Sequence, residues 1–592
     1  MLSTTAVTAA AVPAARVGFQ GSPSVKSTAG RAKATPFRTS VVTKAAIADP
    51  PTKGTKGDEV PATTGAGRKK VVVLGSGWGA ISFIKSLPAD TPYDVVLVSP
   101  RNYFLYTPLL PGAATGAVEE RSIVEPIRRP IGEKGWKYYE AECIDVDAKR
   151  KKVTCRAADP TFECDLNDKD CPWHTFDIDY DYLVTAVGAI PNTFGVPGVE
   201  EHTMFFKEIV HASKFRFEVS ERFERATLPD VPEERLKELL TFVVIGAGPT
   251  GVELAAELYD MVYQDVARMY PSRLLPFVSI KIIDLQEKIL SAYDRRIAEY
   301  ATDFFQRAKI ECLLGVGVNE VKEGAVVLTD NKTKEVKEVP FGLAVWCTGI
   351  KLNPLCERIM DSLPEGSQTN RRSLATDKTL RVKGSNGTIF ALGDCATIER
   401  PRSMDKAMEL YSVAAKCSLD GVCDEDLTKE ELKAALQRGV EEFPHLEEVI
   451  NNIDAKFDAF ADKATGKCTF EGFSGMLTEV DNGLRALPAT AQVAKQEGEY
   501  LAQFFAECDG NADKLAGDGS RFDYVHKGSL AYIGKDAAVA DIPGFTIVKG
   551  IAAGIIWKSF ETISQVSVRN IFLVASDMIR TKIFGRDISR FN

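Results

Sequence analysis

A β-strand, a glycine-rich turn and an α-helix follow one another twice in this 592-residue chain, and this pattern restricts the fold more than any other feature. The second copy lies at residues 240–258 (LTFVVIGAGPTGVELAAEL), where the apolar run 241–245 is typical of a strand buried on both faces. Gly246, Gly248 and Gly251 then have the GxGxxG spacing, which permits a tight turn, the approach of a pyrophosphate and close packing of helix on strand. The N–H groups that begin the helix would face the phosphates.

The first copy lies at residues 71–80 (VVVLGSGWGA) and reads Gly75-x-Gly77-x-x-Ala80 after another apolar run. A single match of this kind also describes an ordinary strand–helix turn. Two matches in one chain indicate two bound nucleotides.

Composition sets further limits. The length allows two or three domains, and the net charge of −9 argues against general nucleic-acid binding. The twelve cysteines are irregularly spaced and indicate no disulfide framework, and Cys155, Cys164, Cys171 and His174 do not have the spacing of a zinc site. No apolar run approaches the roughly 18–20 residues of a membrane-spanning helix, so any membrane attachment is expected to be peripheral.

The N-terminal segment 1–48 contains no Asp or Glu and is rich in Ala, Ser, Thr and Val, with Lys and Arg spread among them. This composition is typical of an organellar transit peptide. The segment 1–15 is uncharged, and together with the prolines at 13, 23 and 36 this favours a plastid over a mitochondrion. The segment 49–68, rich in Pro, Gly and Thr, is predicted to be a linker.

The two nucleotide units differ at the end of their second strand. In the first unit, the strand at 95–99 ends with Ser99, where a generic fingerprint has an acid for the ribose. In the second, the strand at 280–284 ends with Asp284, an acid placed for an adenosine ribose diol. Because Asp284 follows Gly246 by more than the usual ~20 residues, a lengthened helix and loop are expected at 260–276. Gly188 and Gly349 end corresponding crossover strands.

The chain then returns with residues 388–394, an apolar strand that ends in Gly393 and Asp394, whose carboxylate is a natural acceptor for a polyol hydroxyl. Two nucleotide units, the second inserted between the halves of the first, are the arrangement of flavoproteins with two dinucleotide-binding domains. We therefore predict an α/β fold with two Rossmann-like domains, FAD in the first and NAD(P)H in the second.

Four further blocks carry a more specific resemblance: SPRNYFLYTPLLPG at 99–112, LPATAQVAKQEGEYL at 487–501, YVHKGSLAYIGKDAAVAD at 524–541 and FGRDISRF at 584–591. They resemble segments of the type II (alternative) NAD(P)H:quinone oxidoreductases, from about residue 69 to the C-terminus with one large insertion. The resemblance implies non-covalent FAD, hydride transfer from NADH, and two-electron reduction of a membrane quinone, plastoquinone or ubiquinone, without proton pumping.

Site residues are implied by the same resemblance. The residues implied to hold FAD are Gly75, Gly77 and Ala80 at the pyrophosphate, Ser99 and Arg101 near the adenosine ribose, Thr107 near the flavin, Asp394 on the ribityl chain, and Gly188 and Gly393. The residues implied to line the NADH site are Gly246, Gly248, Gly251, Glu253, Asp284 and Gly349. Gln492 and Gln496, catalytic together with Glu253, would lie between flavin and quinone, where an amide can donate to a quinone oxygen without titrating.

Other classes of protein match fewer of these features. Residues 75–142 contain no cysteine, which excludes dithiol–disulfide reductases with a cysteine pair after the first fingerprint. A sulfide:quinone oxidoreductase could use Cys347 with Cys155, Cys164 or Cys171, but would leave Asp284 without a role. A soluble NAD(P)H-dependent flavoprotein reductase with a protein acceptor, and a non-catalytic calcium-responsive scaffold, are the remaining alternatives.

The insertion at 415–483 resembles a degenerate pair of EF-hands, which plant relatives can carry at this place. The first loop has Asp420, Asp424 and Glu431 at positions 1, 5 and 12, but lacks an acid at position 3 and a glycine at position 6. The second keeps Gly466 at position 6 but has Ala461 and Gly472 at positions 1 and 12. We expect a helical module with weak or no calcium binding and no other metal site.

From Val568, apolar residues recur at i, i+3 and i+4, with basic residues nearby, which predicts an amphipathic helix lying in a membrane surface. Packing on the protein's own core, or on a second subunit as in a homodimer, is the alternative. A peripheral protein of an organellar membrane is predicted, with the thylakoid favoured over the mitochondrial inner membrane. The predicted segments are the transit peptide 1–48, linker 49–68, FAD domain 69–239 and 371–414, NADH domain 240–370, insertion 415–483, flavin- and quinone-site segment 484–540, and membrane-anchoring segment 541–592.

Overall fold

The computed structural model describes residues 67–158, 175–399, 402–414, 426–440, 443, 445–484, 486–511, 514–515, 521–543 and 547–589. The predicted transit peptide, most of the linker, and Cys164, Cys171, His174, Asp420 and Asp424 lie outside these residues. The described part belongs to one compact unit, residues 64–592.

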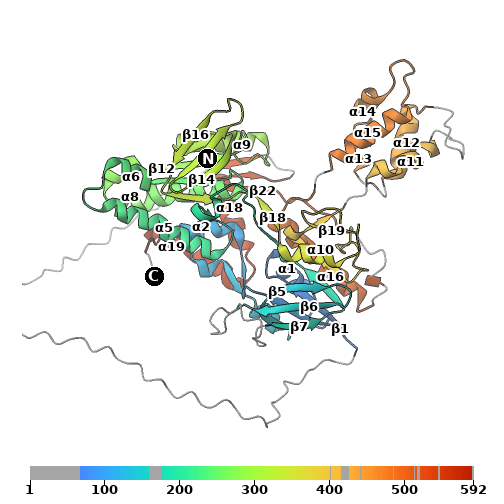
Figure 1. The fold of residues 1–592 in the computed structure, drawn as a ribbon, viewed down its shortest axis with the longest axis horizontal. Coiled ribbons are helices and arrows are strands. Elements are labelled where there is room, and N and C mark those ends of the chain that lie inside the picture. Colours follow the sequence, from blue (N-terminus) through green and yellow to red (C-terminus); the bar gives the residue numbers. More distant parts are fainter. Residues whose placement is uncertain are drawn as a thin grey trace, which may run out of the picture. The chain divides into compact units, whose positions relative to one another are not determined.

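The first nucleotide unit is built on a seven-stranded sheet in the order β20-β8-β1-β2-β5-β6-β7. Figure 1 labels β1, β5, β6 and β7 of this sheet. The strands are β1 (Lys69–Leu74), β2 (Tyr93–Ser99), β5 (Lys137–Asp147), β6 (Lys152–Ala157), β7 (Thr175–Asp179), β8 (Tyr182–Thr185) and β20 (Ile389–Ala391). Five of them, from β20 to β5, run parallel, and β6 and β7 continue antiparallel. Helix α1 (Trp78–Ser86) follows β1 directly, as the first fingerprint predicts.

The second unit contains a five-stranded parallel sheet in the order β10-β17-β11-β12-β13. Its strands are β10 (Met204–Phe205), β11 (Thr241–Ile245), β12 (Ser279–Asp284), β13 (Glu311–Leu314) and β17 (Leu343–Trp346). Helix α7 (Pro249–Asp260) continues as a π-helix, Met261–Val266, and then α8 (Ala267–Met269), so the lengthened helix before Asp284 is confirmed. An antiparallel sheet of β14 (Val316–Lys322), β15 (Ala325–Asp330) and β16 (Val336–Pro340) completes the unit.

The two units are joined in the manner that the sequence predicts. Strand β20 lies far along the chain from β8 and pairs with it, so the second unit is inserted into the first. The short strands β9 (Ala189–Pro191) and β18 (Ile350–Leu352), which follow the two crossovers, pair with each other. The α/β fold with two dinucleotide-binding units is thus confirmed. Helices α5 (Ile209–Thr227), α6 (Glu233–Leu239), α9 (Arg295–Arg307) and α10 (Pro354–Ser362) lie between these strands in the chain.

Four helices and one bridge characterise the insertion: α12 (Lys429–Gly439), α13 (Leu446–Asn451), α14 (Ile453–Phe460), α15 (Phe470–Asn482) and the β-bridge between Leu427 and Cys468. Leu427 and Cys468 occupy the same position, 8, of the two loops proposed from the sequence, so the bridge joins the loops as a pair. Glu431 closes the capping box of α12, where its carboxylate accepts from the N–H and hydroxyl of Thr428, each at 2.9 Å.

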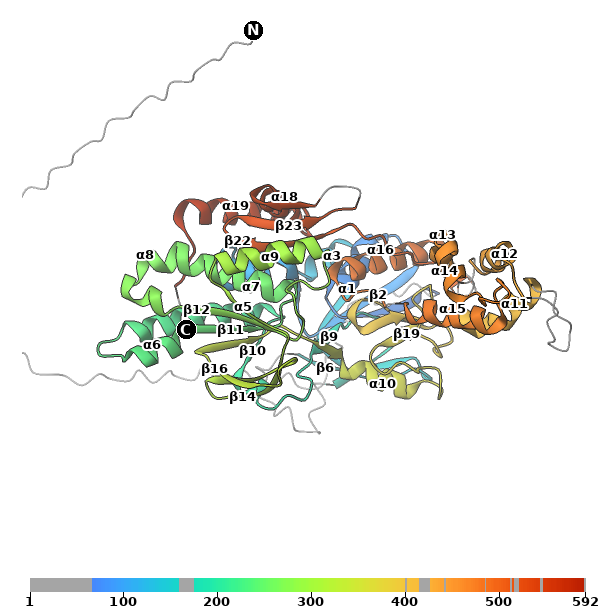
Figure 2. The ribbon, with the colours of Figure 1, turned by 90° about the horizontal axis from the view of Figure 1, so that it is seen from above.

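The C-terminal region returns to both units (Figure 2). Helix α16 (Ala491–Cys508) packs on α1 so closely that a Cβ on Gly498 would lie 2.4 Å from the carbonyl oxygen of Gly79. The chain then forms the sheet of β22 (Ser529–Gly534), β23 (Ala537–Asp541) and β24 (Val548–Gly550), followed by α18 (Ile551–Ile563) and α19 (Val568–Phe584). Strand β22 packs on α7 and α18 packs on β23.

Candidate active site

One cavity of about 1380 Å³ is lined by both nucleotide units. The residues of the first unit come from the β1–α1 turn, the end of β2, the crossover after β8 and the turn after β20; the second unit contributes residues 346–350 after β17. The cavity is larger than the roughly 300–1,000 Å³ of a drug-sized ligand pocket, as a dinucleotide requires. Of the predicted residues, those that line it are Gly75, Gly77, Ser99, Arg101, Thr107, Gly188, Gly349, Gly393 and Asp394.

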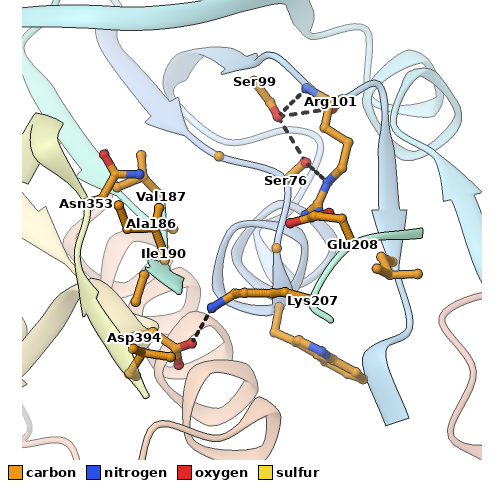
Figure 3. A pocket seen from close by; sticks show the side chains of 18 of the residues that line it. Ser76, Ser99, Arg101, Ala186, Val187, Ile190, Lys207, Glu208, Asn353 and Asp394 are labelled. Atoms are coloured by element: carbon orange, nitrogen blue, oxygen red, sulfur yellow. Dashed lines mark hydrogen bonds and ion pairs between the residues drawn. The ribbon is translucent and has the colours of Figure 1, made fainter. Parts of the chain in front are cut away.

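At one end of the cavity, a polar cluster takes the place of the usual acid (Figure 3). The hydroxyl of Ser99 lies 3.0 Å from that of Ser76, and the Arg101 Nε donates to Ser76 at 3.2 Å. The guanidinium of Arg101 also forms a 2.5 Å ion pair with Glu208. A carboxylate is therefore present at this end, but it comes from the segment before α5.

A second ion pair in the lining of the cavity joins Lys207 to the predicted residue Asp394. The Lys207 Nζ lies 3.7 Å from the Asp394 carboxylate (Figure 3). The N–H of Gly393 donates at 2.6 Å to Glu497 on α16, and burial raises the pKa of Glu497 to about 7. The sequence prediction missed Lys207 and Glu208, which lie in no motif, and Glu497, which lies in the block 487–501 but is not one of its implied site residues. Each of them meets its partner only in the folded chain.

The residues of the first unit fit FAD. Gly75 has φ +106°, and a Cβ there would lie 2.3 Å from the carbonyl oxygen of Ala186, so only glycine is accommodated in this turn. A Cβ on Gly77 would instead meet no atom within 4 Å, which leaves its backbone open to a pyrophosphate at the start of α1. Ala80 is buried within α1.

The second fingerprint repeats this geometry. A Cβ on Gly251 would lie 1.9 Å from the carbonyl oxygen of Gly246, whereas one on Gly248 would meet no atom within 4 Å. Asp284 stands at the end of β12, where its carboxylate accepts from the N–H of Ala247 at 2.6 Å and of Gln286 at 2.7 Å. The predicted ribose acid thus lies beside the glycine-rich turn, although it does not line the cavity.

Gln492 and Gln496 lie on successive turns of α16, and both amides bind the segment 524–528. Gln496 exchanges two 3.0 Å hydrogen bonds with the backbone of Val525. The Gln492 oxygen accepts from the Tyr524 hydroxyl and the Lys527 N–H, each at 2.8 Å. The cavity is lined instead by Thr490, Ala491 and Ala494 of the same helix, so the place of the amides between flavin and quinone stays a prediction.

Glu253 also points away from the cavity. Its carboxylate accepts from the N–H of Tyr532 on β22 at 3.1 Å, and burial raises its pKa well above the usual value. Glu561 on α18 is nearby, buried and hydrogen-bonded by the Tyr106 hydroxyl at 2.8 Å. These carboxyl groups occupy the junction of both nucleotide units with the C-terminal region, and their role in catalysis stays a prediction.

Cys143 and Cys347 both line the cavity, but Cys155, the described partner proposed for Cys347, does not. Cys347 lines the cavity, and burial raises the pKa of its thiol. Cys155 instead lies in the core beside Cys143. Cys164 and Cys171 lie outside the described residues. The described thiols therefore give no support to sulfide chemistry.

Comparisons with known proteins agree with this geometry. Residues 69–416 match the model of the pyridine nucleotide-disulphide oxidoreductase family, and residues 526–587 match the NDH2 C-terminal domain. The chain is 39% identical over 541 residues to the external alternative NAD(P)H-ubiquinone oxidoreductase B1, mitochondrial, of Solanum tuberosum, covering 88% of this chain and 90% of that protein. It is 40% identical over 536 residues to the corresponding B4 protein of Arabidopsis thaliana, with coverage of 88% and 89%.

Solved structures give the same result. NDH2 from Plasmodium falciparum in complex with NADH superposes with a TM-score of 0.74 at 31% identity, covering 88% of this chain and all of that one. The sulfide:quinone oxidoreductase of Aquifex aeolicus shares the fold, with a TM-score of 0.54 at 16% identity. Because the identity to the plant relatives extends over most of both chains, the protein belongs to the family of type II, or alternative, NAD(P)H:quinone oxidoreductases.

Proposed function

We propose that the protein oxidises NADH and reduces a membrane quinone without pumping protons. Bound in the cavity, FAD would accept a hydride from NADH and pass two electrons to the quinone. The observation that carries this proposal is the single cavity lined by the crossovers of both units, at Gly188 and at Gly349. This shared cavity, whose lining includes residues of α16, would let the two nucleotides meet at one place.

The chain's own residues have separate parts in this proposal. Gly77 and Gly248 would each leave room for a pyrophosphate at a helix N-terminus. Arg101 and Glu208 would meet the adenosine end of FAD, and Asp394 would accept from the ribityl chain. Asp284 would accept from the ribose hydroxyls of NADH. Gln492, Gln496 and Glu253 would act on the quinone side, where Glu253 could hold a proton because burial keeps its pKa high.

Exposed apolar side chains support attachment to a membrane surface. None of the described helices combines the length and apolar content that crossing a bilayer requires. On α19 the buried residues are Asn570, Val574 and Asp577, whereas Phe572 is 71% exposed. The other strongly exposed apolar residues of α18 and α19 are Ile551, Ile555, Phe560, Ile563, Val568, Ile579, Ile583 and Phe584. Such a surface suits the boundary of headgroups and acyl chains.

The quinone and the compartment follow from different observations. The relatives are named as mitochondrial ubiquinone oxidoreductases, and this favours ubiquinone here. The uncharged segment 1–15 and the prolines at 13, 23 and 36 favour a plastid, and hence plastoquinone. Both observations indicate an organelle, and residues 1–68 fused to a fluorescent protein would decide between the two.

The insertion is proposed to be an EF-hand-derived module that binds calcium weakly or not at all. The paired loops at Leu427 and Cys468 support its origin, and the engagement of Glu431 in a capping box supports the loss of calcium binding.

Two matched variants test the function. Gly77→Ala and Gly248→Ala each add one methyl group where the protein offers open space, so neither should disturb the fold. Gly77→Ala should lower the FAD content of the purified protein. Gly248→Ala should keep FAD but slow its bleaching by NADH. In the wild type, NADH should reduce the flavin, and ubiquinone or plastoquinone analogues should then reoxidise it. A wild type without flavin, or a reduced flavin that quinones do not reoxidise, would refute the proposal.

The membrane surface is tested by Phe572→Ser with Ile579→Ser, which removes exposed apolar groups only. In a flotation assay the double variant should no longer float with liposomes. It should also lose more activity with long-tailed quinones than with short ones. If it stays on the liposomes, and the wild type is a dimer that the variant converts to monomers, the surface joins two subunits.

A further inference from the structure

Four free cysteines gather in one apolar cluster beside the first sheet. Cys155, Cys356 and Cys395 are fully buried in this cluster, and Cys143 packs against it. They form two neighbouring pairs: Cys143 lies opposite Cys155 on adjacent strands, and the proximity of Cys395 raises the pKa of Cys356. Neither pair has a part in the proposed function.

We propose that Cys143 and Cys155 form a reversible cross-strand disulfide at the wall of the cofactor cavity, by exchange with a small-molecule disulfide that reaches the partly exposed Cys143.

The backbone already has the geometry of a cross-strand disulfide. Cys143 on β5 and Cys155 on β6 are directly opposed in the antiparallel pair, and the register shifts immediately after Cys143. Opposed residues in such a pair have Cα atoms about 4.5–5.5 Å apart, within the roughly 4.4–6.8 Å that disulfides span. A bond between the two sulfur atoms therefore needs no change of register.

Access distinguishes this pair from the second one. Cys143 is partly exposed and lines the cavity with Glu142, Ile144 and Arg156. Cys356 on α10 and Cys395 after β20 are both fully buried, and neither lines the cavity. The second pair is thus an internal control, since its thiols are also neighbours but both are fully buried and out of reach of a reagent.

The exchange balances without any further reactant. The sulfur of Cys143 attacks the disulfide RSSR, loses its proton and releases one RSH, which gives a mixed disulfide on Cys143. The sulfur of Cys155 then attacks Cys143, loses its proton and releases the second RSH. The two thiols are oxidised by two electrons and RSSR is reduced to two RSH.

The test uses the FAD-loaded protein with Cys164 and Cys171 replaced by serine, because these two residues are also potential partners. The protein is equilibrated with glutathione disulfide and glutathione at graded ratios, unfolded, alkylated and digested with trypsin. Cleavage at the basic residues 149–152 separates Cys143 (peptide 138–149) from Cys155 (peptide 153–156). We expect these peptides to be joined with the loss of two alkylatable thiols per chain, and dithiothreitol to reverse the change.

Single variants then separate the two steps. With Cys155→Ser, Cys143 should accumulate as a mixed disulfide with one glutathione. With Cys143→Ser, Cys155 should stay alkylatable at every ratio. The peptides of Cys356 and Cys395 should remain fully alkylated throughout. Full alkylation of Cys143 and Cys155 at all ratios, or a glutathione adduct on Cys143 in place of the cross-link, would overturn the proposal. Equal oxidation of the Cys356–Cys395 pair would refute the argument from access.

Discussion

The buried carboxyl group of Glu561 gives a quantitative prediction about stability. Glu561 is 5% exposed on α18 and accepts a hydrogen bond from the Tyr106 hydroxyl. Burial raises its pKa from 4.5 to about 7, and the hydrogen bond from Tyr106 offsets part of this rise. Glu253 on α7 and the hydroxyl of Tyr293 face the same junction.

The sign follows from the order of the two pKa values. Below pH 4.5 the carboxyl group of Glu561 is protonated in both the folded and the unfolded chain, so its raised pKa costs the folded state no stability. Between pH 4.5 and 7 the unfolded chain releases its proton first, and the free energy of unfolding falls as the pH rises. Above pH 7 the cost is constant, at about 3 kcal/mol for this displacement.

Glu561→Gln removes this titration and keeps an oxygen that can accept from Tyr106. The variant should therefore gain about 2 to 3 kcal/mol relative to wild type between pH 5 and pH 8. Unfolding of the FAD-saturated protein in urea at several pH values measures the difference. Tyr106→Phe is the opposing control, since loss of the hydrogen bond should enlarge the pH dependence, and the double variant should show no more pH dependence than Glu561→Gln alone. A difference between Glu561→Gln and wild type that is constant from pH 5 to pH 8 would refute the reasoning.

Three further outcomes are expected. Asp284→Asn should improve the use of NADPH relative to NADH, because the carboxylate repels a 2′-phosphate; equal efficiency of the wild type with both donors at neutral pH would contradict this. Gln496→Ala should slow quinone reduction and leave NADH-dependent bleaching of the flavin nearly unchanged in stopped-flow traces. If Gln496→Ala slows the reduction of the flavin as much as the reduction of the quinone, the bonds of Gln496 to Val525 only support the fold. Calorimetry should find no tight calcium site, and a tight site abolished by Glu431→Gln would overturn the degenerate assignment.

Local signals in the sequence were sufficient for much of the fold. The two fingerprints predict both β–turn–α units, and the interval between Gly246 and Asp284 predicts the lengthened helix that α7 and the π-helix form. The return of the chain at Gly393 and Asp394 predicts the pairing of β20 with β8. These features depend on residues close together in the chain, or on a fixed order of strands.

Contacts between distant residues were not predictable in the same way. Arg586 is buried and pairs at 3.0 Å with both Glu257 and Asp265, which belong to the second nucleotide unit, far earlier in the chain. Lys207, Glu208 and Glu497 likewise meet their partners from separate elements. Although Arg586 and Glu497 lie in the blocks 584–591 and 487–501, the sequence does not reveal their partners, because a buried charge is stabilised only by partners that the tertiary fold supplies.

The C-terminal helix shows how such partners change the meaning of a sequence pattern. An amphipathic pattern from Val568 is equally compatible with an apolar face turned to the core. The structure turns the polar face inward, because Asn570 donates to the carbonyls of Ser122 and Val124, and Asp577 accepts from Glu119 and Ser122. With its polar groups satisfied within the protein, α19 keeps its apolar groups outside.

Arg586 limits how the exposed apolar face of α19 can be removed without disturbing the fold. Truncation after Ser564 would release the exposed face of α19, but it would also delete Arg586 and leave Glu257 and Asp265 buried without their cation. Breaking a buried pair in this way costs about 3–5 kcal/mol, so loss of activity in the truncated chain would report on folding as much as on membranes. Serine substitutions at Phe572 and Ile579 leave these ion pairs intact, which makes them the decisive measurement of whether the protein reaches its quinone through this face.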